Sequence, residues 1–147
     1  MPGDLHHVAV FVNDLDRALH LFRNLLGFEV AWRLPKVGGR VSEVTGIPGM
    51  EAEIVYLQGR SRGTALELVR IIRTPTEKNT PGNGIPGSVV LSFVVEDLDG
   101  LHRLLSNEGW TPFTQPVEMM SPDGGPIRMF CFPAEDGLTV ELIETKK

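Results

Sequence analysis

The chain has 147 residues, a length that fits a single domain spanning residues 1–147. Hydrophobic residues make up 41% and charged residues 22% of the sequence, which supplies enough apolar surface for a core and argues against intrinsic disorder. The formal net charge is −5 at pH 7, whereas nucleic-acid binding needs a basic face. We therefore expect no nucleic-acid partner.

The sequence carries no signal for export or for membrane insertion. Its one cysteine, Cys131, excludes an intrachain disulfide framework. Since Cys131 lies between two phenylalanines, it is predicted to be a small apolar core residue. The N-terminus lacks the basic and apolar regions of a signal peptide, and no apolar stretch approaches the ~20 residues of a membrane span. We expect a soluble cytoplasmic protein without membrane contact.

The first predicted element is an apolar strand over residues 5–12, and a helix follows it. Asn13 or Asp14 can cap the start of this helix, and Gly27 can end it. One helix face collects apolar residues at spacings of three and four: Leu15, Ala18, Leu19, Phe22 and Leu26. Three further strands complete a β-α-β-β-β unit, at residues 28–34, 52–57 and 65–69.

The same pattern then repeats. A strand over residues 88–95 precedes Asp97, which matches Asp14, and Gly109 matches Gly27. The helix face between them consists of Leu98, Leu101, Leu104 and Leu105. The remaining strands of this copy are predicted at residues 111–117, 128–132 and 139–143. The chain therefore divides into module one (residues 4–72), a polar linker rich in proline and glycine (residues 73–87) and module two (residues 88–144).

Each closing strand holds a glutamate between apolar neighbours, Glu67 in module one and Glu141 in module two. Side chains alternate across a strand, so both carboxylates share a face with residues that look buried. An unpartnered buried carboxylate is costly or becomes protonated. A solvent-facing edge strand would explain one such glutamate, but the matched positions favour a shared partner such as a metal cation.

His7 lies in the opening strand, on the same face as Ala9. A lone strand histidine is more often structural than a ligand. Together with Glu67 and Glu141, however, it makes a set of one imidazole and two carboxylates. That set suits Fe(II), Mn(II), Ni(II) or Zn(II), with positions left open for water or substrate. Glu67 or Glu141 could also act as a catalytic general base.

Two motifs resemble the vicinal-oxygen-chelate superfamily, which includes glyoxalase I, extradiol dioxygenases and bleomycin-resistance proteins. The first is His6-His7-Val8-Ala9-Val10 followed by Asp14-Leu15-Asp16-Arg17-Ala18 and Leu26-Gly27-Phe28. The second is the ending Asp136-Gly137-Leu138-Thr139-Val140-Glu141-Leu142. The resemblance implies an α+β fold in which two βαβββ modules form a cupped mixed sheet around a pocket.

The resemblance also implies metal positions on the first and last strand of each module. In this sequence they fall on His7, Glu67, Glu141 and, where relatives usually have a ligand, Val90. Valine cannot coordinate a metal. A one-residue bulge would offer Ser92 or Ser88 instead, but serine is a poor ligand for such metals.

Two functions follow from this resemblance. The first is a metal-dependent enzyme, a lyase, isomerase or dioxygenase, acting on a small oxygen-chelating organic substrate. The second is a metal-free binding protein that sequesters a small hydrophobic or cationic compound, as in bleomycin resistance. The resemblance implies a homodimer for both.

A set of large side chains could line an apolar pocket, although plain core is their commoner role: Trp32, Met119, Met120, Phe130 and Phe132.

Overall fold

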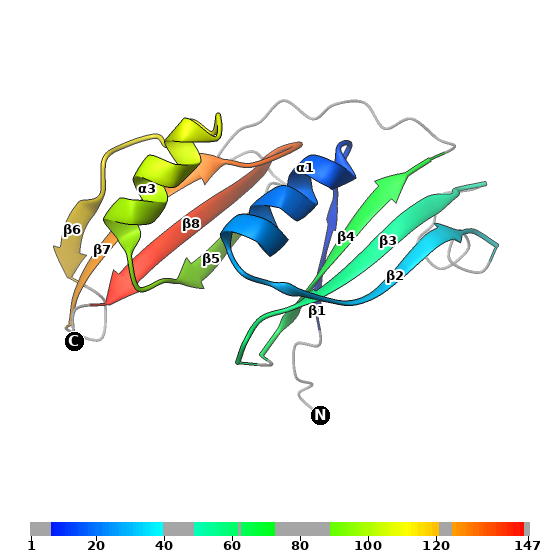
Figure 1. Cartoon of the computed structure of the whole chain (residues 1–147), viewed down its shortest axis with the longest axis horizontal. Helices are drawn as coiled ribbons and strands as arrows, with labels where there is room; N and C mark the ends of the chain where they lie inside the picture. Colours follow the sequence, from blue (N-terminus) through cyan, green and yellow to red (C-terminus); the bar gives the residue numbers. More distant parts are fainter. Residues whose placement is uncertain (1–6, 40–48, 62, 73–88, 121–124, 146–147) are drawn as a thin grey trace. The chain divides into compact units, whose positions relative to one another are not determined.

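The computed structural model describes residues 7–39, 49–61, 63–72, 89–120 and 125–145 (Figure 1). The chain forms two compact units, residues 1–78 and 79–147. The predicted linker, residues 73–87, lies outside the described residues. No helix in the described ranges is long and apolar enough to cross a lipid bilayer.

The described residues of unit 1 form a four-stranded mixed sheet and one helical segment. Its strands follow the spatial order β1-β4-β3-β2, in which β1 and β4 are parallel and the other neighbours are antiparallel. The elements are β1 (His7–Phe11), α1 (Leu15–Leu19), a π-helical stretch (His20–Leu25), β2 (Glu29–Val37), β3 (Ala52–Gln58) and β4 (Ala65–Ile71).

Unit 2 repeats this arrangement, with the strand order β5-β8-β7-β6 and a parallel pair formed by β5 and β8. Its elements are β5 (Val89–Val94), α3 (Leu98–Asn107), β6 (Val117–Met120), β7 (Pro126–Pro133) and β8 (Leu138–Thr145). The two βαβββ units confirm the predicted α+β, glyoxalase-like fold.

The duplication extends to the helix caps. Asp14 Oδ1 accepts a hydrogen bond from the backbone N–H of Arg17, and Asp97 Oδ1 accepts one from Gly100, both at 2.9 Å. Gly27 and Gly109 follow the helical segments with φ of 78° and 94°, values that favour glycine. The caps and stops predicted from the sequence are confirmed.

One predicted strand is wrong. The sequence pattern placed a strand over residues 111–117, whereas β6 begins at Val117. Pro112 and Pro116 lack the N–H that a sheet ladder needs, so the segment between them cannot pair as a regular strand. The backbone N–H of Phe113 donates to the carbonyl of Cys131 on the neighbouring strand at 2.9 Å.

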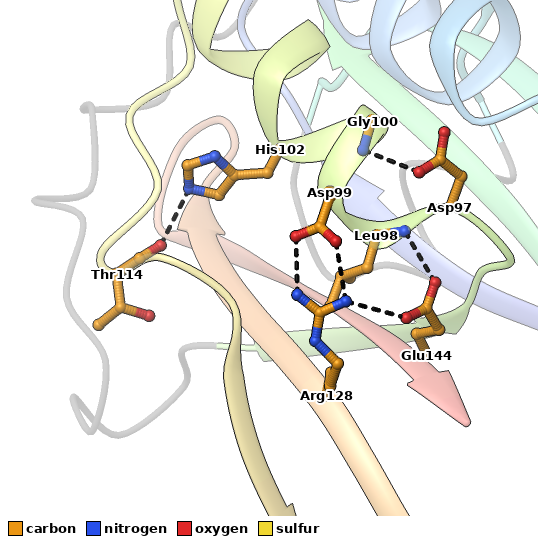
Figure 2. Close-up of polar contacts among 8 residues, drawn as sticks. All are labelled: Asp97, Leu98, Asp99, Gly100, His102, Thr114, Arg128 and Glu144. Carbon is orange, nitrogen blue, oxygen red and sulfur yellow. Dashed lines mark hydrogen bonds and ion pairs between the residues drawn. The ribbon is translucent and has the colours of Figure 1, made fainter. Parts of the chain in front are cut away.

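The helix and a polar network cover one face of the sheet in unit 2 (Figure 2). Arg128 on β7 donates to Asp99 on α3 at 2.7 and 2.9 Å and to Glu144 on β8 at 3.3 Å. Glu144 also accepts from the backbone N–H of Leu98 at the start of α3, at 3.1 Å. The network therefore ties the helix start to the sheet, and it shows which sheet face the helix covers.

Unit 1 places an ion pair at the matching position but with the charges exchanged. Glu53 on β3 lies opposite Arg70 on β4, as Arg128 lies opposite Glu144. The nearly buried Glu53 accepts from Arg33 Nε at 2.9 Å and from Arg70 Nη2 at 3.1 Å. Burial alone would raise the pKa of Glu53, but hydrogen bonds from Arg33 and then Arg70 outweigh it, so its pKa lies below the usual 4.5.

By register, Glu53 lies on the face of the unit 1 sheet that matches the helix side of unit 2. We call the other face of each sheet the open face. It carries His7, Trp32, Tyr56 and Glu67 in unit 1, and Val90, Ser92, Cys131 and Glu141 in unit 2.

Glu53→Gln is expected to lower the free energy of unfolding by about 1–2 kcal/mol, because it removes charge-assisted hydrogen bonds from two arginines. Since the folded-state pKa is depressed, this contribution is present above the usual pKa and is lost as pH falls through the folded value. The gap between wild type and variant in urea unfolding should therefore shrink at acid pH. Lys36→Gln, which breaks the exposed pair with Glu51, is the control and should stay within about 0.5 kcal/mol.

Candidate functional site

His7 and Glu67 lie together on the open face of unit 1. They project from the adjacent parallel strands β1 and β4, where His7 lies opposite Ala65 and Glu67 lies opposite Ala9. His7 Nε2 is 3.9 Å from Glu67 Oε2. The His7 side chain is 36% exposed and that of Glu67 is 17% exposed, so both are partly accessible.

Two aromatic side chains continue this arrangement across the sheet. Tyr56 on β3 lies opposite Glu67, and Trp32 on β2 lies opposite Tyr56. The rings of Trp32 and Tyr56 are stacked, with centroids 4.7 Å apart, and the His7 ring meets Tyr56 edge-on at 5.8 Å. No pattern in the sequence points to Tyr56 as a site residue, because only strand register brings it beside Glu67.

Glu141 has different neighbours on the open face of unit 2. It lies on β8 between Ser92 on β5 and Cys131 on β7. The Ser92 hydroxyl donates to Glu141 Oε1 at 2.7 Å, and the Cys131 thiol donates to Oε2 at 3.7 Å. Cys131 is therefore a half-buried partner of Glu141, and not simply a core residue as expected. Burial, followed by the charge of Glu141, raises the pKa of this thiol.

Val90 occupies the position of His7 in the second unit. His7 lies opposite Ala65 and Val90 lies opposite Thr139, and each of these partners is two residues before the glutamate of its closing strand. The register of β5 on β8 continues without a shift from Val89 to Val94, so no bulge brings Ser92 into the position of Val90. Ser88 lies outside the described residues. Val90 is 51% exposed.

The donor atoms of unit 1 fit a divalent cation. Imidazole nitrogen and carboxylate oxygen are both ligands that zinc takes in proteins, so His7 and Glu67, 3.9 Å apart, would be the residues of unit 1 that hold a metal ion. Across the described parts of both units, however, no three His, Cys, Asp or Glu side chains form a metal-binding group. Unit 1 thus brings two of the predicted ligands together, and the third, Glu141, belongs to unit 2.

Of the side chains predicted to line an apolar pocket, some are core residues and one lies exposed on the open face. Phe130 and Phe132 are fully buried and face the helix side of unit 2, so they are core residues. Trp32 is 42% exposed and lies on the open face. The side chains of Met119 and Met120 are outside the described part of the chain.

Two βαβββ units of this kind define the glyoxalase-like class of folds. The family model of the Glyoxalase/Bleomycin resistance protein/Dioxygenase superfamily matches residues 4–142. The chain therefore belongs to this superfamily. No curated protein matches the chain.

Solved structures with the same fold are distant in sequence. A glyoxalase family protein from Bacillus cereus superposes with a TM-score of 0.82 at 22% identity, covering 100% of this chain and 97% of that one. A glyoxalase/dioxygenase from Nostoc punctiforme gives 0.66 at 19% identity, covering 98% and 92%. The trypanothione-dependent glyoxalase I of Leishmania major gives 0.64 at 18% identity, covering 97% and 87%. At these identities the likeness shows the fold alone.

Glu141→Gln is expected to speed the alkylation of Cys131 by iodoacetamide at pH 8. The carboxylate raises the pKa of the thiol, so its removal increases the fraction of reactive thiolate. The rate is measured in chelator by mass spectrometry, with Glu108→Gln as a control of equal charge change. Equal rates in wild type and Glu141→Gln would contradict the contact between the two side chains.

Proposed function

We propose that this protein is a metal-dependent enzyme, a lyase, isomerase or dioxygenase, that acts on a small organic substrate with two neighbouring oxygens. The observation that carries the proposal is the pair formed by His7 and Glu67, whose donor atoms lie 3.9 Å apart on the accessible face of the sheet. An imidazole beside a carboxylate suits Fe(II), Mn(II), Ni(II) or Zn(II).

In this proposal His7 and Glu67 are metal ligands in unit 1, and Glu141 remains a ligand that the sequence predicts. Bound metal would supply Lewis-acid polarisation of a substrate oxygen. A carboxylate oxygen of Glu67 or Glu141 accepts the proton that the substrate loses. Ser92 and Cys131 orient the Glu141 carboxylate, because each donates to a different oxygen.

Val90 favours a second candidate, a metal-free dimeric binding protein that sequesters a hydrophobic or cationic compound. A half-exposed valine occupies the position of a fourth metal-coordinating residue. It offers a bound compound apolar contact instead of metal coordination. The net charge of −5 suits a cationic compound. Bound metal distinguishes the two candidates.

Protein purified without chelators or a metal-binding tag is expected to contain about one transition metal ion per chain, measured by elemental mass spectrometry. The double variant Glu67→Gln/Glu141→Gln and the single variant His7→Ala should lose the ion, because each removes predicted ligands. His20→Ala is the matched control, since its imidazole lies on the helical segment and contacts Asn24.

If wild type holds no metal after reconstitution with Fe(II), Mn(II), Ni(II) and Zn(II), the enzyme proposal is wrong and the binding-protein candidate takes its place. Metal that remains in the His7→Ala and double variants would show that the ion binds elsewhere.

Val90→His is expected to tighten Zn(II) binding, because it places an imidazole at the register position that matches His7. Competition with a chromophoric chelator measures the change in affinity. Val89→His, at a neighbouring exposed position on the other face of β5, is the control and should leave the affinity unchanged. Equal effects of the two substitutions would count against a metal position at residue 90.

A further inference from the structure

The open face of unit 1 presents an apolar strip next to the His7–Glu67 pair. Trp32 and Leu34 on β2 are 42% and 43% exposed. Their register partners on β3 are the half-buried Tyr56 and the buried Ile54, so all four side chains lie on the face that carries Glu67. Large exposed apolar side chains that gather beside polar groups are typical of a binding surface.

Strand pairing with another chain does not explain this strip. Strand β2 is an edge strand, and an exposed edge can add a further strand. Its register shifts between Val30 and Trp32 and again between Leu34 and Val37, and Pro35 lies within the second irregularity. Bulges and an edge proline are features that prevent such pairing. The exposed apolar side chains are therefore expected to contact a ligand of another kind and not a further strand.

The strip lies at a defined distance from the proposed metal ligands. Adjacent strands are about 4.8 Å apart, so Trp32 on β2 lies roughly 10 Å from Glu67 on β4, with Tyr56 between them on β3. A ligand that touches both ends must be about that long. Since the two side chains that lead away from Glu67 are aromatic, they favour an aromatic partner over an aliphatic one.

We propose that the substrate has two parts: a head with two neighbouring oxygens, bound at His7 and Glu67, and an aromatic tail that passes Tyr56 and contacts Trp32. The position of the head rests on the proposed function. The tail rests on the exposure of Trp32 and Leu34 and on the register that places Tyr56 between Trp32 and Glu67.

Hydroxamic acids test the tail, because each carries two neighbouring oxygens that bind a metal. Zn(II)-loaded protein is titrated calorimetrically with acetohydroxamic, 4-phenylbutanohydroxamic, 4-cyclohexylbutanohydroxamic and 4-(trimethylammonio)butanohydroxamic acid. The phenyl compound is expected to bind about 2- to 10-fold tighter than the cyclohexyl compound. It should also bind tighter than acetohydroxamic acid. Equal affinities, or tighter binding of the trimethylammonium compound, would overturn the aromatic tail.

Substitutions at Trp32 test whether this side chain causes the preference for the phenyl compound. Trp32→Ala should abolish the advantage of the phenyl compound and leave the binding of acetohydroxamic acid unchanged, which also reports a folded protein. Trp32→Phe should retain part of the advantage. Val30→Ala is the control, because Val30 is similarly exposed on the same strand but pairs with Leu57 on the other face. An undiminished phenyl preference in Trp32→Ala would refute the contact.

A metal-free measurement separates this inference from the proposed function. The chain has two tryptophans, and Trp110 is buried, so the two indole N–H resonances can be assigned with Trp32→Phe. 4-Phenylbutanamide, which has the tail but no metal-binding head, is expected to shift the Trp32 resonance at millimolar concentration and not that of Trp110. No shift would overturn the tail. A shift in a protein that binds no metal would refute the proposed function and support the tail.

Discussion

The parallel pairing of the first and last strand in each unit is the constraint on which the rest of the structure depends. It places the opening strand directly beside the closing strand, although about sixty residues separate His7 from Glu67 along the chain. Because side chains alternate along both strands, one register sets which residues reach the open face together. A shift of one residue would turn Glu67 toward the helix side and separate it from His7. The position of the candidate site therefore follows from strand pairing and not from any loop.

The two units preserve this geometry but differ in the chemistry placed on it. On the helix side, a cross-strand ion pair occupies the same register position in both, yet Glu53 and Arg70 carry the opposite order of charges from Arg128 and Glu144. The two charges of this ion pair can be exchanged between the strands when the third charged residue that joins the pair also changes sign. Unit 1 adds an arginine from β2 to its glutamate, and unit 2 adds an aspartate from α3 to its arginine. The open face shows the same freedom, with an imidazole in one unit and valine in the other.

Much of the fold was predictable because its determinants are local. Capping aspartates, terminal glycines and apolar spacings identified both helical segments and the duplication. The strand expected at residues 111–117 is absent before Val117, because Pro112 and Pro116 lack the N–H that a sheet ladder needs. The candidate site was harder to predict from the sequence than the fold. Its glutamates and His7 could be named, since they interrupt apolar strands at matched positions. Tyr56 and the contacts of Cys131 could not, because they depend on cross-strand register, which residues within one strand do not specify.

The open face of unit 1 holds features that a core or an ordinary surface would not retain together. A stacked indole and phenol can be buried to gain stability, yet Trp32 is left partly in water. A carboxylate on a sheet of apolar strands usually pairs with a cation, as Glu53 pairs with two arginines, whereas Glu67 lies 3.9 Å from an imidazole. An imidazole can balance a carboxylate only when protonated, whereas a metal ion balances it while the ring is neutral. A bound ion and a bound aromatic ring would each satisfy one of these exposed groups, which is why we assign both to the same ligand-binding face.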